Sequence, residues 1–371
     1  RTDLRIPPGP DVTFSPDYFA ARDRFRSAAA RLVWAVHTHP IAARGPGDEE
    51  LTLDAAVSSP AGREPLLVTS SGVHGVEGPF GSAVQVAALE EWGRTGPPAG
   101  VRCVFLHAVN PFGFAHRRRF DEGNVDLNRN FLPAGEKFAG GSPTYAALDP
   151  VLNPRRPPSP WDWFEPRAVA AILRYGYEPI KQAVAGGQYE YPNGLFFGGH
   201  GPSASQLILR EHFPGWLSDA LAVAHIDFHT GLGRWATYKL LAEVAFSPTA
   251  VARVERWFGR GVYEPSEPRG VAYRTRGGFG HWCPEAADGR DYLFLVAEFG
   301  TYPILRVLAG LRAENQAHHW GRPADPGTRR AKARLLELFC PASPRWRARV
   351  REQGVTLIRQ AVAGLRGGAG S

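Results

Sequence analysis

The sequence contains no methionine, only three cysteines, and only four lysines among its 43 basic residues. Cys103, Cys283 and Cys340 lie far apart and form no Cys-x-x-Cys pair. This excludes a disulfide framework and a cysteine-based metal site, and it is typical of a reducing compartment. No apolar run approaches the ~18–20 residues that a membrane helix needs, so we expect no membrane segment. The first residues hold no apolar signal core, which favours a cytoplasmic protein, while the start at Arg1 leaves a removed leader open.

Arginine supplies nearly all of the positive charge of this chain. The formal net charge is +7 at pH 7, and the arginines are spread over a sequence with 42 glycines and 33 prolines. No block of basic residues alternates with aromatic side chains, and no nucleic-acid-binding motif is present, so we expect no nucleic-acid partner. A basic surface still favours anionic substrates through electrostatic steering.

Unbroken apolar runs alternate with helix-length segments along most of the chain. Strands are expected at 51–58, 66–69, 101–109, 221–228 and 292–299, and helices at 15–38, 81–92, from about 203, and at 303–318, 327–339 and 344–365. Apolar strands of this kind are buried on both faces. The pattern therefore predicts a three-layer α/β/α fold with a mostly parallel, mixed central sheet. We expect a single domain over residues 1–371, with long loop insertions at 131–166 and 186–202.

Polar side chains follow the predicted strands at the sheet edge where ligands bind in α/β folds. His74 and Glu77 come after the strand at 66–69, three residues apart, a spacing that places both on one face of a turn. His229 follows the strand at 221–228, and His225, on the same face but deeper, is the competing ligand. Two histidines and a glutamate are the ligands of many hydrolytic zinc sites. The alternative for His74 and Glu77 is a glycine-rich turn with surface polar residues. The alternative for His229 is a core histidine whose hydrogen bonds are satisfied within the fold.

Two further strand ends carry candidate residues. Residues 110–131 place Arg117, Arg118, Arg119, Asn128 and Arg129 in a short segment flanked by apolar residues. Guanidinium and amide groups bind carboxylates, so the segment predicts an anion-binding loop, the alternative being a solvated basic loop. Glu298 ends the strand at 292–299, where an unpaired buried carboxylate would be costly. It is therefore either paired or functional, as a base near a metal-bound water would be.

Together, these motifs resemble the zinc metallocarboxypeptidase superfamily, which includes the aspartoacylase and succinylglutamate desuccinylase branch. The resemblance rests on His74-x-x-Glu77, the Asn-Pro-x-Gly turn at 110–113 followed by Asp-Leu-Asn-Arg-Asn at 126–130, then His229 and Glu298. The order and spacing cover residues 65–305, and the insertion at 187–206 is similar to that of a bacterial branch.

The resemblance implies a role for each of these residues. His74, Glu77 and His229 would bind one Zn²⁺ per chain, and Glu298 would act as general base and proton shuttle. Asn128 and Arg129 would hold the terminal carboxylate of the substrate. Arg119 would polarise the scissile carbonyl, with Arg117 and Arg118 as open alternatives, and Arg118 is a further candidate for substrate contact.

Three more positions take their interpretation from the resemblance. Asp126 would orient a histidine ligand from behind. Tyr273, four residues before the glycines at 277 and 278, would be a mobile substrate-binding tyrosine. Gly280 occupies the place where an acidic residue would select basic side chains, which gives no reason to expect a preference for lysine or arginine.

The resemblance implies a zinc hydrolase that cleaves an amide bond next to a carboxylate-bearing residue, first as a metallocarboxypeptidase acting on peptides. The alternative is an amidohydrolase that releases the acyl group of an N-acyl amino acid, and a third is a catalytically inactive binding protein. The two enzymes share every catalytic residue. An open groove beside the metal favours peptides, whereas a pocket capped by 131–166 and 186–202 favours N-acyl amino acids. The natural substrate and the oligomeric state stay open.

Overall fold

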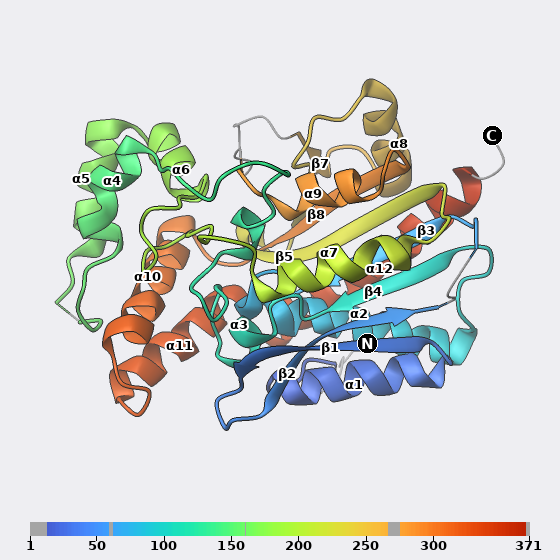
Figure 1. Cartoon of the computed structure of the whole chain (residues 1–371), viewed down its shortest axis with the longest axis horizontal. Coiled ribbons are helices and arrows are strands. Elements are labelled where there is room, and N and C mark those ends of the chain that lie inside the picture. The colour runs from blue at the N-terminus through green and yellow to red at the C-terminus, as the bar shows by residue number, and fades with distance from the viewer. Residues whose placement is uncertain (1–12, 59–61, 160, 266–274, 369–371) are drawn as a thin grey trace, which may run out of the picture.

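A mixed β-sheet runs through the middle of the molecule in the computed structural model, which describes residues 13–58, 62–159, 161–265 and 275–368 (Figure 1). The strand order is β1-β2-β4-β3-β5-β8-β6-β7. The central strands β4, β3, β5 and β8 pair in parallel, while β1, β2 and β6 form antiparallel pairs toward the two edges. The predicted fold class is therefore confirmed. The strands are β1 (Ala35–Arg44), β2 (Glu50–Val57), β3 (Leu66–Ser71), β4 (Arg102–His107), β5 (Ala222–Trp235), β6 (Tyr238–Leu241), β7 (Tyr263–Glu264) and β8 (Asp291–Gly300).

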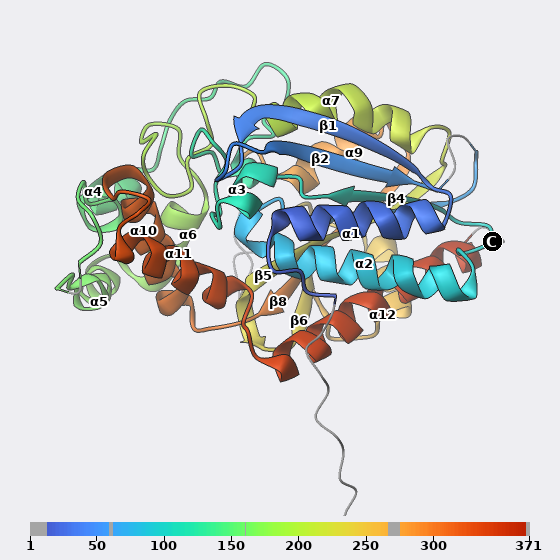
Figure 2. The same ribbon diagram turned by 90° about the horizontal axis from the view of Figure 1, so that it is seen from below.

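Helices cover both faces of the sheet, and the strand side chains alternate between two buried clusters. On one face, Leu293 and Leu295 of β8 pack in a cluster with α1 (Tyr18–Arg31), α2 (Gly78–Thr95) and α12 (Pro344–Gly368), which Figure 2 shows on one side of the sheet. On the other face, Phe294 and Val296 pack with α7 (Ala204–Leu217) and α9 (Phe279–Ala286). Because both faces are buried, the central strands are apolar at successive positions.

A group of helices lies beyond the carboxyl ends of the central strands, at the left of Figure 1. It contains α4 (Pro143–Leu152), α5 (Phe164–Tyr175), α6 (Tyr177–Ala185), α10 (Ile304–Trp320) and α11 (Pro326–Phe339), which share a third apolar cluster. The predicted loop at 131–166 thus contains α4 and the start of α5, while 186–202 holds a single bridge between Gln188 and Phe197. The remaining helices are η1 (Gly75–Glu77), α3 (Pro111–Ala115), η2 (Leu127–Arg129) and α8 (Pro248–Phe258).

The predicted first helix is too long at its carboxyl end. α1 ends at Arg31, Val33 adopts a positive φ of 59°, and β1 begins at Ala35, opposite Val57. A left-handed backbone cannot continue an α-helix, and a half-exposed edge strand shows no apolar run that would reveal it. Over the described ranges, no helix combines the length and apolar character that a bilayer crossing requires.

Candidate metal centre and active site

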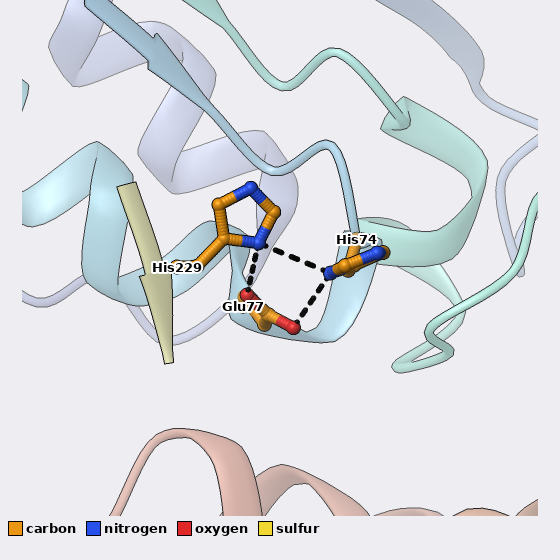
Figure 3. A group of neighbouring side chains, drawn as sticks. All are labelled: His74, Glu77 and His229. Carbon is orange, nitrogen blue, oxygen red and sulfur yellow. Dashed lines mark hydrogen bonds and ion pairs between the residues drawn. The ribbon is translucent and has the colours of Figure 1, made fainter. Parts of the chain in front are cut away.

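Three side chains converge at the carboxyl edge of the sheet, His74 and Glu77 from the turn after β3 and His229 from within β5 (Figure 3). His74 Nδ1 lies 2.8 Å from Glu77 Oε1, and His229 Nδ1 lies 3.1 Å from His74 Nδ1 and 3.0 Å from Glu77 Oε2. All three residues are buried. The structure therefore brings together the three residues predicted to bind a metal ion and leaves His225 outside the group.

The turn that carries His74 and Glu77 packs tightly against α3. A Cβ atom on Gly75 would lie 2.1 Å from the carbonyl carbon of Gly113, so only glycine fits at this position. Glu77 N donates to His74 O at 3.0 Å, which closes a single turn and places both side chains on one side. Glu77 Oε2 also accepts a hydrogen bond from Thr230 N at 2.9 Å, which ties the turn to β5.

Each histidine contacts an aspartate through the ring nitrogen that faces away from the site. His74 Nε2 lies 3.1 Å from Asp126 Oδ1, and His229 Nε2 lies 2.6 Å from Asp227 Oδ2. A carboxylate can only accept, so the contact with Asp227 places a proton on Nε2 of His229 and leaves its Nδ1 facing the site. Nε2 of His74 lies between Asp126 and the donor Nη2 of Arg119, which is 2.7 Å away, and its Nδ1 faces Glu77. Asp126 therefore lies where the resemblance implies. Asp227 was missed, although its even spacing from His229 on one strand face is a signal that could have revealed it.

This donor set fits a divalent metal ion. Two imidazole nitrogens and one carboxylate face a common point, a combination that zinc commonly binds. The donors of a tetrahedral zinc site with bonds of about 2.0–2.1 Å lie about 3.3 Å apart. The two histidine nitrogens lie 3.1 Å apart, close to this value, and they lie 2.8 and 3.0 Å from different oxygens of Glu77.

The charges around the site also favour a cation. Burial acts to lower the pKa of His229, but Asp227 and Glu77 raise it well above its usual value. Burial acts to raise the pKa of Glu77, but His74 and His229 hold it well below its usual value. The two carboxylates thus stabilise positive charge between them, which is the charge that a metal ion would supply.

A chain of buried hydrogen bonds continues from the site into the sheet. Ser70 Oγ donates to Asp227 Oδ1 at 2.6 Å and lies 2.8 Å from His225 Nε2, while His225 Nδ1 lies 2.8 Å from the hydroxyl of Tyr292. Burial lowers the pKa of His225 to about 3, so this ring stays neutral. His225 is therefore a partner of Ser70 and Tyr292, and three strands fix the orientation of His229 through Asp227.

The three consecutive arginines have different environments. Arg119 lines the cavity beside the metal centre, donates from Nε to Asp126 Oδ2 at 2.9 Å, and places Nη1 3.5 Å from Glu77 Oε1. Arg118 is buried away from this cavity and pairs with Glu314 of α10 at 3.0 Å, so it holds the fold rather than a substrate. Arg117 is exposed. Arg119 is thus the member of the run that can reach a substrate.

Glu298 lies beside the metal centre on the neighbouring strand. It is the register partner of His229 in the β5–β8 pair, and its Oε1 accepts a hydrogen bond from Leu232 N at 2.8 Å. Burial, followed by the charge of Glu77, raises the pKa of Glu298 to about 7. Its carboxyl group can therefore exchange a proton near neutral pH.

Asn128 and Arg129 form hydrogen bonds with other residues of the fold. Arg129 is fully buried and donates to the backbone carbonyls of Ala185 and Asn128, and it does not line the cavity. Asn128 does line the cavity, but its Oδ1 accepts from Phe279 N at 2.7 Å, at the start of α9, and its Nδ2 donates to Glu243 Oε1 at 3.0 Å. The structure therefore does not place these two residues as an open pair for a substrate carboxylate.

A cavity of about 350 Å³ contains the metal-ligand group, Arg119 and Glu298. Helices α6 and α10 and the 186–202 loop contribute to its walls through Tyr177, Phe196 and Val307. Lys181 and Glu243 also line it. Glu243 follows only three apolar residues, 240–242, which are too few to predict a buried strand, and Lys181 follows none. Tyr273 lies outside the described residues.

The fold and the site define an α/β protein with a candidate metal centre at the carboxyl edge of its sheet. The chain belongs to the family described as "Protein of unknown function (DUF2817)", whose model matches residues 14–353. No curated protein matches the chain.

Solved structures that are similar to this chain include proteins described as metallopeptidases and carboxypeptidases. One is a "putative metallopeptidase" from Shewanella amazonensis SB2B, with 15% identity over 88% of this chain and 94% of that chain and a TM-score of 0.42. Carboxypeptidase A from Helicoverpa armigera has 12% identity over 86% of this chain and 73% of that chain, with a TM-score of 0.45. Bovine thrombin-activatable fibrinolysis inhibitor, in complex with tick carboxypeptidase inhibitor, has 12% identity over 91% and 97%, with a TM-score of 0.43. The roles of single residues rest on the geometry described above.

Proposed function

We propose that this protein is a zinc-dependent hydrolase that cleaves an amide bond next to a carboxylate-bearing residue, as a metallocarboxypeptidase does. The observation that carries the proposal is the convergence of His74, Glu77 and His229 in a cavity that also contains Glu298. Zinc held by these three residues would supply a Lewis acid and lower the pKa of water to about 7.

Glu298 is the proton carrier in this proposal. Its carboxylate, fixed by Leu232 N, would accept a proton from the attacking water and return it to the departing amine. Arg119 projects into the same cavity with its guanidinium held by Asp126. It would stabilise the negative charge that develops on the carbonyl oxygen of the substrate.

The substrate carboxylate has a different partner from the one that the resemblance implies. Asn128 and Arg129 make their hydrogen bonds within the fold, whereas Arg119 and Lys181 are the cationic side chains in the described lining of the cavity. We therefore assign the carboxylate contact to Lys181 and the carbonyl oxygen to Arg119. A carboxylate held there would orient the neighbouring amide bond toward the metal centre.

The test is a comparison of metal content with hydrolysis. We expect purified protein to bind about one zinc ion per chain and to release the C-terminal residue of N-blocked dipeptides. Chelation should stop this release and added zinc should restore it. A protein that binds zinc and cleaves no substrate would instead be a binding protein that keeps the fold, which would overturn the proposal.

The small volume of the cavity favours a second candidate, an amidohydrolase acting on N-acyl amino acids. A volume of about 350 Å³, with walls from α6, α10 and the 186–202 loop, suits a small molecule better than a long peptide. A panel that pairs N-acetyl and N-succinyl amino acids with blocked dipeptides ending in the same residues separates the two activities. Faster release from the acyl amino acids would identify a deacylase.

A further inference from the structure

A second cavity, of about 680 Å³, lies apart from the metal centre. The ends of α1 and α10, the turn between β1 and β2, and the helices α3 and α11 form much of its wall, and we call it the α3 cavity. Val76 and Pro79 line it, whereas Glu77, which lies between them in sequence, lines the metal-centre cavity. Among the described residues, the two cavities have no lining residue in common, so each can hold a ligand of its own.

One part of the wall is apolar and fixed in position. Phe112 and Phe114 of α3 both line the cavity. The ring of Phe114 lies where a side chain on Gly78 would be, 2.4 Å from an added Cβ atom, which holds α3 against the start of α2. The ring of Phe112 stacks on that of His116, with 4.1 Å between the ring centroids. These rings offer a preformed surface to the apolar body of a small molecule.

Two cationic side chains line the same cavity. Arg117 is exposed and forms no ion pair within the described part of the chain. Its φ of 54° is a left-handed backbone conformation that is costly for an arginine. Lys332 Nζ donates to His116 O at 3.0 Å and to Glu314 Oε1 at 2.7 Å. An ammonium group has three N–H donors, so one donor of Lys332 is left for a ligand.

Positive charge exceeds negative charge around Glu314. Over the described ranges, Glu314 is the one carboxylate that forms an ion pair with Arg118 or Lys332, and it pairs with both. Burial lowers the pKa of Lys332, Glu314 raises it, and the charges of Arg118 and Arg117 lower it further. Nη1 of Arg118 is buried without a hydrogen-bond partner among the described residues. This cluster of three cations therefore has fewer acceptors than its donors can use.

The two acidic side chains of the lining do not correct this imbalance. Asp17 Oδ1 accepts from Ala20 N at 2.9 Å at the start of α1, and Glu49 Oε2 accepts from Gly47 N at 2.9 Å in the turn between β1 and β2. Both side chains are exposed, and within the described structure neither forms an ion pair with the cations of the cavity. The cavity thus presents a cationic wall beside an apolar one.

We propose that the α3 cavity is a second ligand site, which binds a small organic anion. The carboxylate of this ligand accepts hydrogen bonds from Arg117 and from the remaining donor of Lys332, and its apolar body packs against Phe112 and Phe114. A guanidinium holds a carboxylate through two parallel hydrogen bonds, so Arg117 gains the anionic partner that it lacks within the chain.

The experiment measures binding of 2-naphthoate and its neutral amide, 2-naphthamide, to the intact protein by calorimetry. We expect the anion to bind about tenfold more tightly than the amide, as hydrogen bonds to a charged group allow. Arg117→Gln should remove most of this difference by weakening naphthoate alone. Phe112→Ala should weaken both ligands alike, because it removes apolar surface and no charge.

Arg330→Gln is the matched control, since it removes an exposed arginine of α11 that does not line the cavity. It should leave both affinities unchanged. Lys181→Gln tests the location, because it removes a cation from the metal-centre cavity. A loss of naphthoate binding in Lys181→Gln and none in Arg117→Gln would overturn the inference. So would equal affinities of the wild-type protein for the two ligands, or binding of neither.

Binding in the α3 cavity requires neither zinc nor turnover, so its test is independent of the proposed function. Titrations with zinc and with chelator should give the same affinity for naphthoate. An anion that binds to the zinc-loaded protein alone would lie at the metal centre and would overturn the inference. A protein that binds naphthoate through Arg117 and hydrolyses no substrate would refute the hydrolase and keep the inference.

Discussion

At the residue scale, two glutamates in one cavity have opposite acid strengths. Glu77 lies between two imidazoles, which hold its pKa well below its usual value against the effect of burial. Glu298 is buried beside the charge of Glu77, and its pKa is raised to about 7. Environments that separate the pKa values of two like groups commonly mark different chemical roles. Glu77 suits a metal ligand, and Glu298 suits a group that gains and loses a proton.

Glu298→Gln should keep zinc and lose nearly all hydrolysis, by roughly 10²–10⁴-fold or more in kcat. The amide oxygen of glutamine can still accept the hydrogen bond from Leu232 N, but the amide cannot accept the proton of the attacking water. Zinc content by elemental analysis and kcat on the best substrate check this prediction. Turnover close to that of the wild-type protein would remove Glu298 as the base.

Hydrolysis should rise with pH through the neutral range. The base must be ionised, and the raised pKa of Glu298, about 7, leaves much of it protonated in mild acid. A metal ion beside Glu77 favours the ionised form and moves the acidic limb of the kcat/KM profile to or below pH 7. The profile of the wild-type enzyme measures this limb. A rate that falls as pH rises from 5 to 7 would contradict the assignment.

At the element scale, burial decides which parts of the fold can be predicted from the sequence. β3, β4, β5 and β8 are buried on both faces, so their apolar runs reveal them and place His74, Glu77, His229 and Glu298 near one edge of the sheet. β1, β6 and β7 lie at or next to the sheet edges, are partly exposed and show no such run. Glu243 follows β6, so its place in the cavity depends on pairing that local sequence does not encode.

The close packing of η1 against α3 predicts the effect of a single methyl group. Gly75→Ala would place a Cβ atom 2.1 Å from the carbonyl carbon of Gly113, so the turn that carries His74 and Glu77 must move. We expect a loss of about 1–3 kcal/mol in the free energy of unfolding, together with weaker zinc binding. Chemical denaturation and zinc titration measure both quantities.

Gly93→Ala is the control for this substitution. Gly93 is an exposed residue of α2 with no atom within 4 Å of an added Cβ, so alanine should be neutral or stabilising there by up to about 1 kcal/mol. Unchanged zinc binding in Gly75→Ala would show that the turn tolerates displacement.

At the scale of the whole molecule, the site joins segments that are distant in sequence. His74 and His229 are 155 residues apart, and the side chains around them come from the turn after β3, from β5 and β8, and from the 119–128 segment. An unfolded chain cannot reproduce this arrangement, so a bound metal ion stabilises only the folded state. The sequence motifs predict the members of the site, whereas the internal bonding of Asn128 and Arg129 depends on α9 and α6, which the motifs do not describe.

Removal of the metal should therefore lower the stability of the whole protein. A metal concentration of 100 times the dissociation constant contributes about 2.7 kcal/mol. Thermal unfolding with and without chelator should show a higher midpoint in zinc, and His229→Ala should lose this difference. Equal midpoints for the wild-type protein under both conditions would argue against a metal held between β5 and the turn after β3.

Arg118 and Arg119 are neighbours in sequence but contact different parts of the molecule, which has a consequence for how the cavity can change in evolution. Arg118 is anchored to Glu314 of α10, and the next residue, Arg119, extends toward the metal centre. Because Arg118 is paired with Glu314, a shift of α10 would also move Arg118. The adjacent Arg119, whose guanidinium is proposed to contact the substrate carbonyl, would then change its position. Substitutions in α10 outside its cavity-lining residues would thus change reactivity with every metal ligand intact, which gives natural variation a route to new substrates.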